Sequence, residues 1–208
     1  TELVLNSVIK SDVVIYPSNW AMQFVLDKLF EKGIRVNKQF HIIENAPLQI
    51  FYEHRNIKNK LPEKLKFVTH HWSTNELKGF DFYKVFASWC KNEGHSFTYI
   101  GRSQYKNDFT VDPMNEQQLS VELPKHDVYL TASKFEAGAN HVLEAVAAGL
   151  PILYSRDGGS ISEYVKNYGV EHNSNIQSII QSIDVLRADY KNISKSIGKY
   201  KANIENIA

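Results

Sequence analysis

The stretch that decides the fold is SKFEAGANHVLEAVAAGLPILYSRDGGSISEYV, residues 133–165. A predicted buried strand at 127–131 precedes it, and it contains a predicted helix at 140–148 and a second strand at 151–154. A glycine and then a proline end the helix, because glycine is favoured just past a helix C-terminus and proline cannot continue the helix. A strand, a helix and another strand in about thirty residues form one repeat of an open parallel sheet. The sequence therefore predicts an α/β fold with a doubly wound, Rossmann-like parallel sheet.

The loop before this helix is a candidate ligand site, because such folds bind ligands where a strand's carboxyl end leads into a helix. Free backbone N–H groups at the helix start, where the dipole favours an anion such as phosphate, are expected at Gly138, Ala139, Asn140 and His141. Two carboxylates flank this turn: Glu144 could accept hydrogen bonds from a vicinal diol such as a ribose, and Glu136 from sugar hydroxyls. The plainer alternative is that Glu136 caps the helix or faces solvent and that Glu144 pairs with a surface lysine.

Composition narrows the class of protein. The chain has 208 residues, of which 43% are hydrophobic and 23% charged, an ordinary balance for a soluble protein. A net charge of +1 argues against general nucleic-acid binding, which needs a basic field. The single Cys90, expected to be buried in a helix, excludes an internal disulfide framework and a cysteine-based zinc site. Because no apolar run is long enough to span a membrane and no signal peptide is visible, we expect a cytoplasmic location.

Strands and helices alternate along the whole chain, which favours a parallel sheet. The polar segment 51–66 is expected to be a linker whose Lys and Arg side chains are solvated. Before it we expect the end of a helix at 3–10, a strand at 12–16, a helix at 20–32 and a strand at 40–43. After it we expect strands at 66–69, 96–100 and 168–172, loops at 70–79 and 108–113, and helices at 80–92, 116–123, 176–187 and 190–207.

The run E-A-G-A-N-H-V-L-E-A-x-A-x-G-L-P-I, followed by D-G-G-x-x-E, resembles the donor-binding motif of retaining glycosyltransferases with the GT-B fold. The resemblance implies that the chain is the C-terminal half of such a fold. Residues 1–50 would be the tail of the N-terminal acceptor domain, 51–65 a linker, 66–190 the nucleotide-sugar donor-binding domain and 191–208 a C-terminal helix. Ser18 and Asn45 lie where the last unit of that N-terminal domain has a strand-ending Ser and a turn Asn.

The same resemblance assigns roles in the loop after residue 69. Lys78-Gly79 matches a Lys-Gly pair whose lysine holds the donor diphosphate, and Lys78 and Glu136 are the expected catalytic residues. The arginine that normally shares the diphosphate is absent, and Ser73 stands at its spacing. Ser73 or a nearby histidine is expected to donate a hydrogen bond instead, and Arg102 could supply charge from the next loop.

A metal site is not expected. His70 and His71 are adjacent, so at a strand end they would point to opposite faces, and no Cys or Asp cluster stands beside them. The chain also has no Asp-x-Asp sequence, the metal-binding signature of the other common glycosyltransferase fold. We expect no cofactor beyond the nucleotide-sugar substrate, with a uridine donor implied by the family.

The leading functional hypothesis is transfer of a sugar, with retained configuration, from a nucleoside diphosphate to a glycan or lipid-linked acceptor in surface polysaccharide synthesis. The missing N-terminal domain or a partner chain would bind the acceptor, and the full protein could associate peripherally with the inner face of the membrane. A second hypothesis is a non-catalytic nucleotide-binding module that works with a partner chain. A third is a GT-B-fold sugar-nucleotide epimerase, although epimerases lack the Glu-Ala-Gly-x-Asn run. A response-regulator-like domain is a distant fourth, because no cluster of acids follows the first strand.

Overall fold

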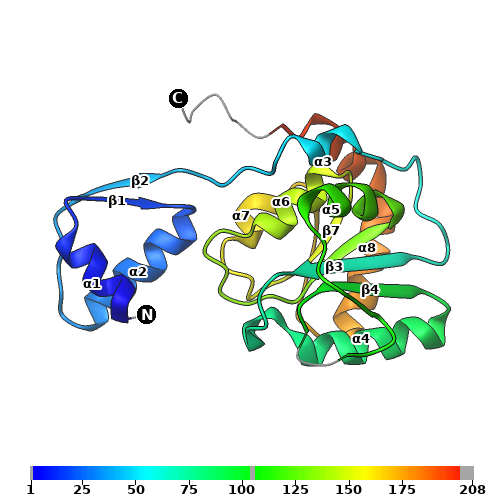
Figure 1. Ribbon diagram of the computed structural model, residues 1–208, viewed down its shortest axis with the longest axis horizontal. Coiled ribbons are helices and arrows are strands. Elements are labelled where there is room, and N and C mark those ends of the chain that lie inside the picture. Colours follow the sequence, from blue (N-terminus) through cyan, green and yellow to red (C-terminus); the bar gives the residue numbers. More distant parts are fainter. Residues whose placement is uncertain (1, 104–105, 202–208) are drawn as a thin grey trace.

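The computed structural model describes residues 2–103 and 106–201, and it divides into two lobes (Figure 1). We call residues 2–45 the N-lobe and residues 50–201 the C-lobe. A single extended stretch of chain runs between them, shown in cyan along the top of Figure 1.

The N-lobe has a two-stranded parallel sheet packed against two helices. Its elements are α1 (Glu2–Lys10), β1 (Val13–Tyr16), α2 (Asn19–Glu31) and β2 (Gln39–Ile42). Their bounds lie within a few residues of those expected from the sequence. A small separate core joins the helices to one face of the sheet, and it is built on Leu5, Val8, Tyr16, Ala21, Val25 and Leu29.

The C-lobe is organised on a parallel sheet whose described strands have the order β5-β4-β3-β6-β7-β8. The strands are β3 (Lys66–His71), β4 (Ser96–Gly101), β5 (Thr110–Val111), β6 (Val128–Thr131), β7 (Ile152–Ser155) and β8 (Gly169–His172). Numbered from β3, this order is 3-2-1-4-5-6, the doubly wound arrangement in which strands 1 to 3 are added toward one edge of the sheet and strands 4 to 6 toward the other. The predicted α/β class and parallel Rossmann-like sheet are confirmed.

Helices cover both faces of this sheet (Figure 1). They are α3 (Ile50–Glu53), α4 (Phe80–Glu93), α5 (Glu116–Glu122), α6 (Asn140–Ala147), α7 (Ile161–Val165) and α8 (Ile176–Lys199). Helices α4 and α8 contact each other on one face, and α3 contacts α5 and α6 on the other. Because both faces are covered, β6 and β7 are buried along their whole length, and three of the four residues in each strand are aliphatic or aromatic. Cys90 is buried in α4, as expected, and burial raises the pKa of its thiol.

Three local predictions were wrong. The two C-terminal helices expected at 176–187 and 190–207 are one helix through Lys199, and the part of 191–208 that the structure describes continues it. Its buried residues Ile179, Ile183, Leu186, Tyr190, Ile193 and Ile197 keep a three-and-four spacing through residues 188–189, so nothing interrupts the apolar stripe. The expected loop at 108–113 contains the short edge strand β5, and β3 extends to His71 rather than ending at Thr69.

Within the C-lobe, the segment 51–65 is held against the sheet domain by side chains that we expected to be solvated. The Arg55 guanidinium donates to the carbonyl oxygens of Ala147 (2.8 Å) and Tyr200 (2.9 Å), and Lys58 pairs with the buried carboxylate of Asp127. A cation at the C-terminal end of α6 complements the helix dipole there, so Arg55 has a structural role.

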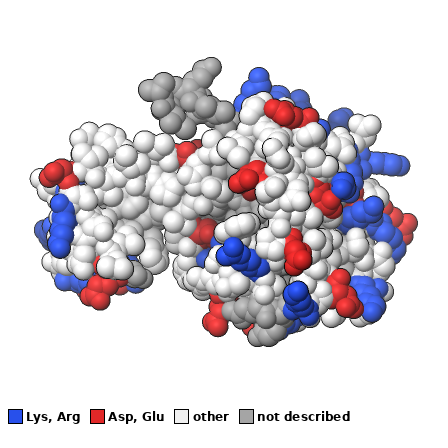
Figure 2. All heavy atoms as spheres, viewed as in Figure 1, with Lys and Arg blue, Asp and Glu red and all other residues white. Residues whose placement is uncertain are grey.

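Charge is distributed without a strong bias. Lys and Arg side chains alternate with Asp and Glu over the face shown in Figure 2, and no basic stripe crosses it. None of the helices among residues 2–103 and 106–201 is long and apolar enough to span a membrane.

Candidate functional site

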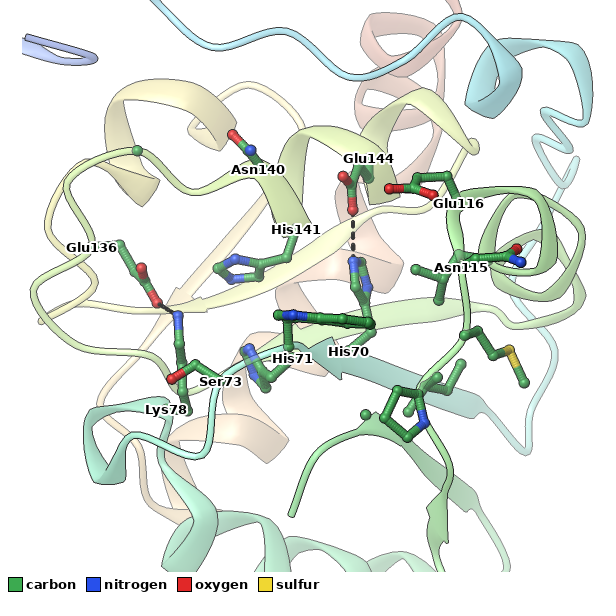
Figure 3. A pocket seen from close by; sticks show the side chains of 17 residues that line it. His70, His71, Ser73, Lys78, Asn115, Glu116, Glu136, Asn140, His141 and Glu144 are labelled. Carbon is green, nitrogen blue, oxygen red and sulfur yellow. Dashed lines mark hydrogen bonds and ion pairs between the residues drawn. The ribbon is translucent and has the colours of Figure 1, made fainter. Parts of the chain in front are cut away.

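A pocket of about 490 Å³ opens at the carboxyl edge of the C-lobe sheet, beside the point where the strand order reverses (Figure 3). The ends of β3 and β4 form one side, and the loop between β6 and α6 forms the other. Of the sequence-predicted site residues, the lining contains Ser73, Lys78, Glu136, Gly138, Asn140, His141 and Glu144. The fold thus brings together residues from the loops that follow β3 and β6 and from helix α6, because the carboxyl ends of parallel strands meet at one edge.

Lys78 and Glu136 form an ion pair at one end of the pocket, with 2.5 Å between Lys78 Nζ and Glu136 Oε1 (Figure 3). Both side chains are largely buried, at 19% and 16% exposed. Lys78 ends a 3₁₀ turn (Glu76–Lys78) that leads through Gly79 into α4. An anion bound at Lys78 would therefore lie beside the Glu136 carboxylate.

Gly79 holds this turn against β6. Its φ of 83° is in the left-handed region, which favours glycine, and a Cβ there would lie 2.7 Å from the Ala132 carbonyl oxygen. The two residues of the Lys-Gly pair therefore have different roles. Gly79 lets the loop approach the sheet closely, and Lys78 reaches into the pocket.

The loop that carries Glu136 is supported from behind by the Gly158-Gly159 turn. Glu136 N–H donates to the Gly158 carbonyl (3.2 Å), and Ser160 N–H donates to the Glu136 carbonyl (2.9 Å). A Cβ on Gly159 would lie 2.6 Å from that same carbonyl oxygen, and its φ is 71°. The downstream Gly-Gly of the motif therefore fixes the backbone of the pocket loop.

Glu144 lies in the first turns of α6 and reaches the pocket from above in Figure 3. Its partner is His70, at 2.7 Å between Glu144 Oε2 and His70 Nε2, and not the surface lysine of the plainer alternative. The side chain of Glu144 is 19% exposed.

Three histidines form the floor of the pocket. The His71 ring lies 5.1 Å from the His141 ring, and His70 lies 6.3 Å from His141, measured between centroids. Burial and the nearby Lys78 charge lower the pKa of His71 well below its usual value, and burial with the neighbouring His71 lowers that of His141. These two imidazoles are therefore neutral at physiological pH and offer hydrogen bonds without adding positive charge.

The start of α6 differs from the expectation in one detail. Asn140 N–H is not free, because it donates to the Gly138 carbonyl at 3.2 Å, and Ala139 is buried behind the pocket wall. Gly138 has little space around it, since a Cβ there would lie 2.6 Å from Asn45 Nδ2 and 2.9 Å from Pro17 Cβ. This glycine therefore also accommodates the N-lobe.

Ser73 lines the pocket, but its hydroxyl accepts a hydrogen bond from Asn75 N–H at 3.1 Å. Arg102 is exposed and does not line the pocket; its guanidinium carbon lies 4.7 Å from the centroid of the Trp72 ring, which does. A cation over an indole face is a favourable contact. Arg102 therefore contacts the pocket lining through Trp72 but does not line the pocket itself.

The N-lobe contacts the C-lobe directly beside this site. Glu163, the acid of the D-G-G-x-x-E run, accepts hydrogen bonds from the backbone N–H groups of Asn19 (3.0 Å) and Trp20 (2.5 Å) at the start of α2. Ser18 caps the same helix and donates to the Ala137 carbonyl at 2.8 Å. Asn45 donates to Asn140 Oδ1 at 2.7 Å. Ser18 and Asn45, aligned by resemblance alone, therefore both contact the pocket loop.

Sequence reasoning missed the pairing of His70 with Glu144, because both histidines were expected in a loop. It also gave no role to Glu163 beyond membership of a motif. Among the described residues, no group of three or more His, Cys, Asp or Glu side chains is arranged to hold a metal ion.

Comparison with known proteins agrees with this geometry. Residues 106–203 match the family model described as glycosyl transferases group 1. The structure is similar to the pneumococcal O-GlcNAc transferase GtfA, solved with UDP and GlcNAc (16% identity, TM-score 0.68, covering 94% of this chain and 42% of that one). It is also similar to the catalytic domain of starch synthase IV from Arabidopsis thaliana, solved with ADP and acarbose (12% identity, TM-score 0.66, covering 98% of this chain and 55% of that one). A third similar structure is WaaG, a glycosyltransferase involved in lipopolysaccharide biosynthesis (16% identity, TM-score 0.62, covering 88% of this chain and 56% of that one).

A comparison with curated protein sequences found no match. The chain spans 42–56% of the three solved chains named above, so it corresponds to about half of such a protein. The Rossmann-like sheet with a pocket at its carboxyl edge is the fold of one half of these GT-B glycosyltransferase structures, and residues 106–203 are similar to the glycosyl transferases group 1 family.

Proposed function

We propose that the chain is the nucleotide-sugar-binding half of a glycosyltransferase that moves a sugar from a nucleoside diphosphate to a glycan or lipid-linked acceptor with retained configuration. The observation that carries the proposal is the Lys78–Glu136 pair, which lies in one pocket with Glu144. A cation for a diphosphate, a carboxylate for sugar hydroxyls and a second carboxylate for a ribose diol are the groups that a nucleotide sugar requires.

Lys78 is the residue expected to stabilise the departing diphosphate. When the bond between the sugar's anomeric carbon and the phosphate oxygen breaks, negative charge grows on the phosphate, and a preorganised ammonium group there lowers the barrier. The Lys78–Glu136 ion pair holds the ammonium group in place before a ligand arrives. Glu136 is then positioned to accept hydrogen bonds from the transferred sugar.

The neutral side chains of His71 and His141 support a mode of diphosphate binding with less positive charge than the lysine and arginine that normally share the diphosphate. His141 lines the pocket, and its Nε2 lies 3.2 Å from Thr131 Oγ1, which orients the ring. An imidazole N–H so placed is a hydrogen-bond donor for a phosphate oxygen, and it would replace the hydrogen bonds of the absent arginine without its charge. We propose that the reaction needs no metal ion and no cofactor beyond the donor.

The acceptor is assigned to the part of the protein that this chain lacks, supplied by the rest of a longer polypeptide or by a partner chain. The N-lobe supports this assignment because one face of its sheet is uncovered, with Val13 49% and Ile15 59% exposed. Surface polysaccharide synthesis, a cytoplasmic site and peripheral attachment at the inner membrane face belong to the same proposal. A non-catalytic nucleotide-binding module with a partner chain remains the second candidate, and the uncovered sheet face favours it equally.

The decisive experiment titrates two variants with two ligands by calorimetry. Thermal-shift screening of nucleoside diphosphates first identifies the base; uridine is expected, and adenosine is included because one structural neighbour was solved with ADP. Glu144→Gln should then weaken the bare nucleoside diphosphate and the nucleotide sugar by the same factor, about tenfold to a hundredfold. Glu136→Gln should weaken only the nucleotide sugar, because the bare diphosphate lacks the group it holds.

Glu171→Gln provides the matched control, since Glu171 pairs with Arg156 on the surface, away from the pocket. The site assignment is wrong if Glu136→Gln also loses the bare diphosphate, or if both pocket variants stay folded and bind like the parent. Transfer to an acceptor, measured with the missing half present, separates an active transferase from a binding module. Interconversion of nucleotide sugars without an acceptor would instead support the epimerase.

A further inference from the structure

His70 stands out among the pocket residues because its ring is held on every side. The side chain comes from the end of β3 and is 7% exposed. Its ring packs edge-on against Tyr129 at 5.5 Å and against His141 at 6.3 Å between centroids. The backbone is fixed as well, since His70 N–H donates to the Tyr129 hydroxyl at 3.1 Å. A ring so enclosed has little freedom to rotate.

The hydrogen bonds of this ring indicate which nitrogen carries the proton. Nε2 lies 2.7 Å from Glu144 Oε2, whereas Nδ1 is buried and has no hydrogen-bond partner. A carboxylate only accepts hydrogen bonds, so Nε2 needs a proton to pair with Glu144, whereas a proton on Nδ1 would be a buried donor without a partner. The proton therefore belongs on Nε2, where it is donated to the carboxylate (Figure 3).

We propose that His70 is a positioning residue that holds the Glu144 carboxylate in the orientation needed to receive a ribose diol. The inference rests on the proposed function, because it takes Glu144 to be the ribose-binding group. The physical reason is the flexibility of a glutamate side chain, which costs conformational entropy to hold in one rotamer. A donor fixed to the sheet removes that freedom before the ligand arrives.

The hydrogen bond does not compete with the ribose. A carboxylate has about four acceptor positions, of which His70 takes one. The remaining positions on both oxygens can accept the two adjacent hydroxyls of a ribose. His70 is therefore expected to strengthen recognition of the diol without contacting the nucleotide's phosphates.

The test uses variants matched to the geometry of the ring. His70→Phe keeps the ring packing against Tyr129 and His141 but removes the donor. His70→Gln places an amide N–H close to the position of Nε2, and His70→Asn places it near Nδ1, too short to reach Glu144. Each variant is titrated with a ribonucleoside diphosphate, its 2′-deoxy analogue and inorganic pyrophosphate, and folding is checked by thermal unfolding.

We expect His70→Phe and His70→Asn to weaken the ribonucleoside diphosphate about tenfold, while His70→Gln recovers most of the affinity. The 2′-deoxy analogue should lose less, and pyrophosphate should bind all variants alike. In a Glu144→Gln background, His70→Phe should have little further effect, because the two residues act as one unit.

The inference is overturned if all three variants discriminate between the ribose and deoxyribose ligands as the parent does, or if affinity for pyrophosphate falls with that for the nucleotide. The second result would indicate a general change in the pocket rather than a role at the diol. Failure of the proposed function has a different signature, in which the parent protein binds no nucleoside diphosphate at all.

Discussion

The two lobes differ in how completely their sheets are covered. In the C-lobe, Tyr129 and Leu153, at the centres of β6 and β7, are 0% exposed, because helices cover both faces. In the N-lobe, β1 leaves Val13 and Ile15 about half exposed or more, because helices cover only one face. A two-stranded sheet with a small core is marginally stable by itself. The C-lobe therefore has the features of an independently stable unit, whereas the N-lobe depends on its neighbours.

The N-lobe nevertheless contacts the pocket loop between β6 and α6, which carries Glu136. Ser18 binds the backbone of that loop at Ala137, and Glu163 holds the first turn of α2. The difference suggests that the C-lobe supplies the binding groups, and that the N-lobe's contribution is to fix the position of the loop. The four predictions below test this division.

The largest expected effect comes from the core of the C-lobe. Leu153→Ala should lower the free energy of unfolding of the whole chain by about 2–5 kcal/mol, because Leu153 is fully buried and truncation leaves a cavity. The same substitution in the N-lobe, Leu29→Ala, removes a side chain that is 1% exposed, but it should open only the N-lobe. Native-state amide exchange resolves the two outcomes by residue.

For Leu29→Ala, protection should be lost in α1, α2 and β1 while β6 and β7 keep the protection of the parent. Equal loss of protection in both lobes would mean that the molecule unfolds as one cooperative unit and that the C-lobe is not independently stable.

Acid should destabilise the C-lobe through His172, whose burial lowers its pKa from 6.5 to about 4. The folded state favours the neutral ring, so its stabilising contribution is complete above about pH 6.5 and decreases as the pH falls toward 4. The loss corresponds to about 3 kcal/mol across that window, with no further loss from this group below it. Urea unfolding of the parent at a series of pH values measures the effect.

His172→Gln should flatten the profile, because an amide can donate to the Thr131 carbonyl, which His172 Nε2 approaches at 3.1 Å, without titrating. His71 and His141 act in the same direction, so the difference between parent and variant isolates His172. His41→Gln, which replaces an exposed histidine of the N-lobe, is the matched control. Identical slopes for the parent and His172→Gln would contradict the prediction.

Lys78→Ala tests whether the C-lobe alone holds the diphosphate. A charged hydrogen bond contributes about 1.5–3 kcal/mol, so affinity for a nucleoside diphosphate should fall about tenfold to a hundredfold. The control is Lys134→Ala, which removes an exposed lysine of the same loop region. Unchanged affinity of Lys78→Ala in calorimetry would remove this residue from the site.

Much of the fold and of the site could be predicted from the sequence, for a physical reason. Apolar runs separated by small-residue stops define strands and helices, and parallel strands bring their following loops to one edge. Lys78 and Glu136 are 58 residues apart in sequence yet pair directly, because their loops follow adjacent strands. The resemblance therefore placed Lys78 and Glu136 at one site, but it did not predict the ion pair between them.

The remaining features depend on packing that no local pattern contains. His70 and His71 are polar, so the apolar pattern ended at Thr69 and hid the last two residues of β3. Glu163 binds backbone N–H groups, which every residue carries, so no side-chain signal could identify its partners. The single helix α8 shows the converse error: a break was predicted at residues 188–189, although the buried stripe continues through them.

The smallest predicted effect concerns Glu163, which joins the two lobes. Its carboxylate accepts from two N–H groups that have no partner inside α2, and its negative charge lies at the positive end of that helix. Glu163→Gln keeps the shape but removes the charge, so it should lower the free energy for opening the N-lobe by about 1 kcal/mol. Amide exchange at the start of α2 should accelerate accordingly, while β6 and β7 remain unchanged and Glu171→Gln has no effect. If Glu163→Gln instead destabilises the whole C-lobe, the carboxylate is part of the main core's support rather than the contact that holds the N-lobe to the pocket loop.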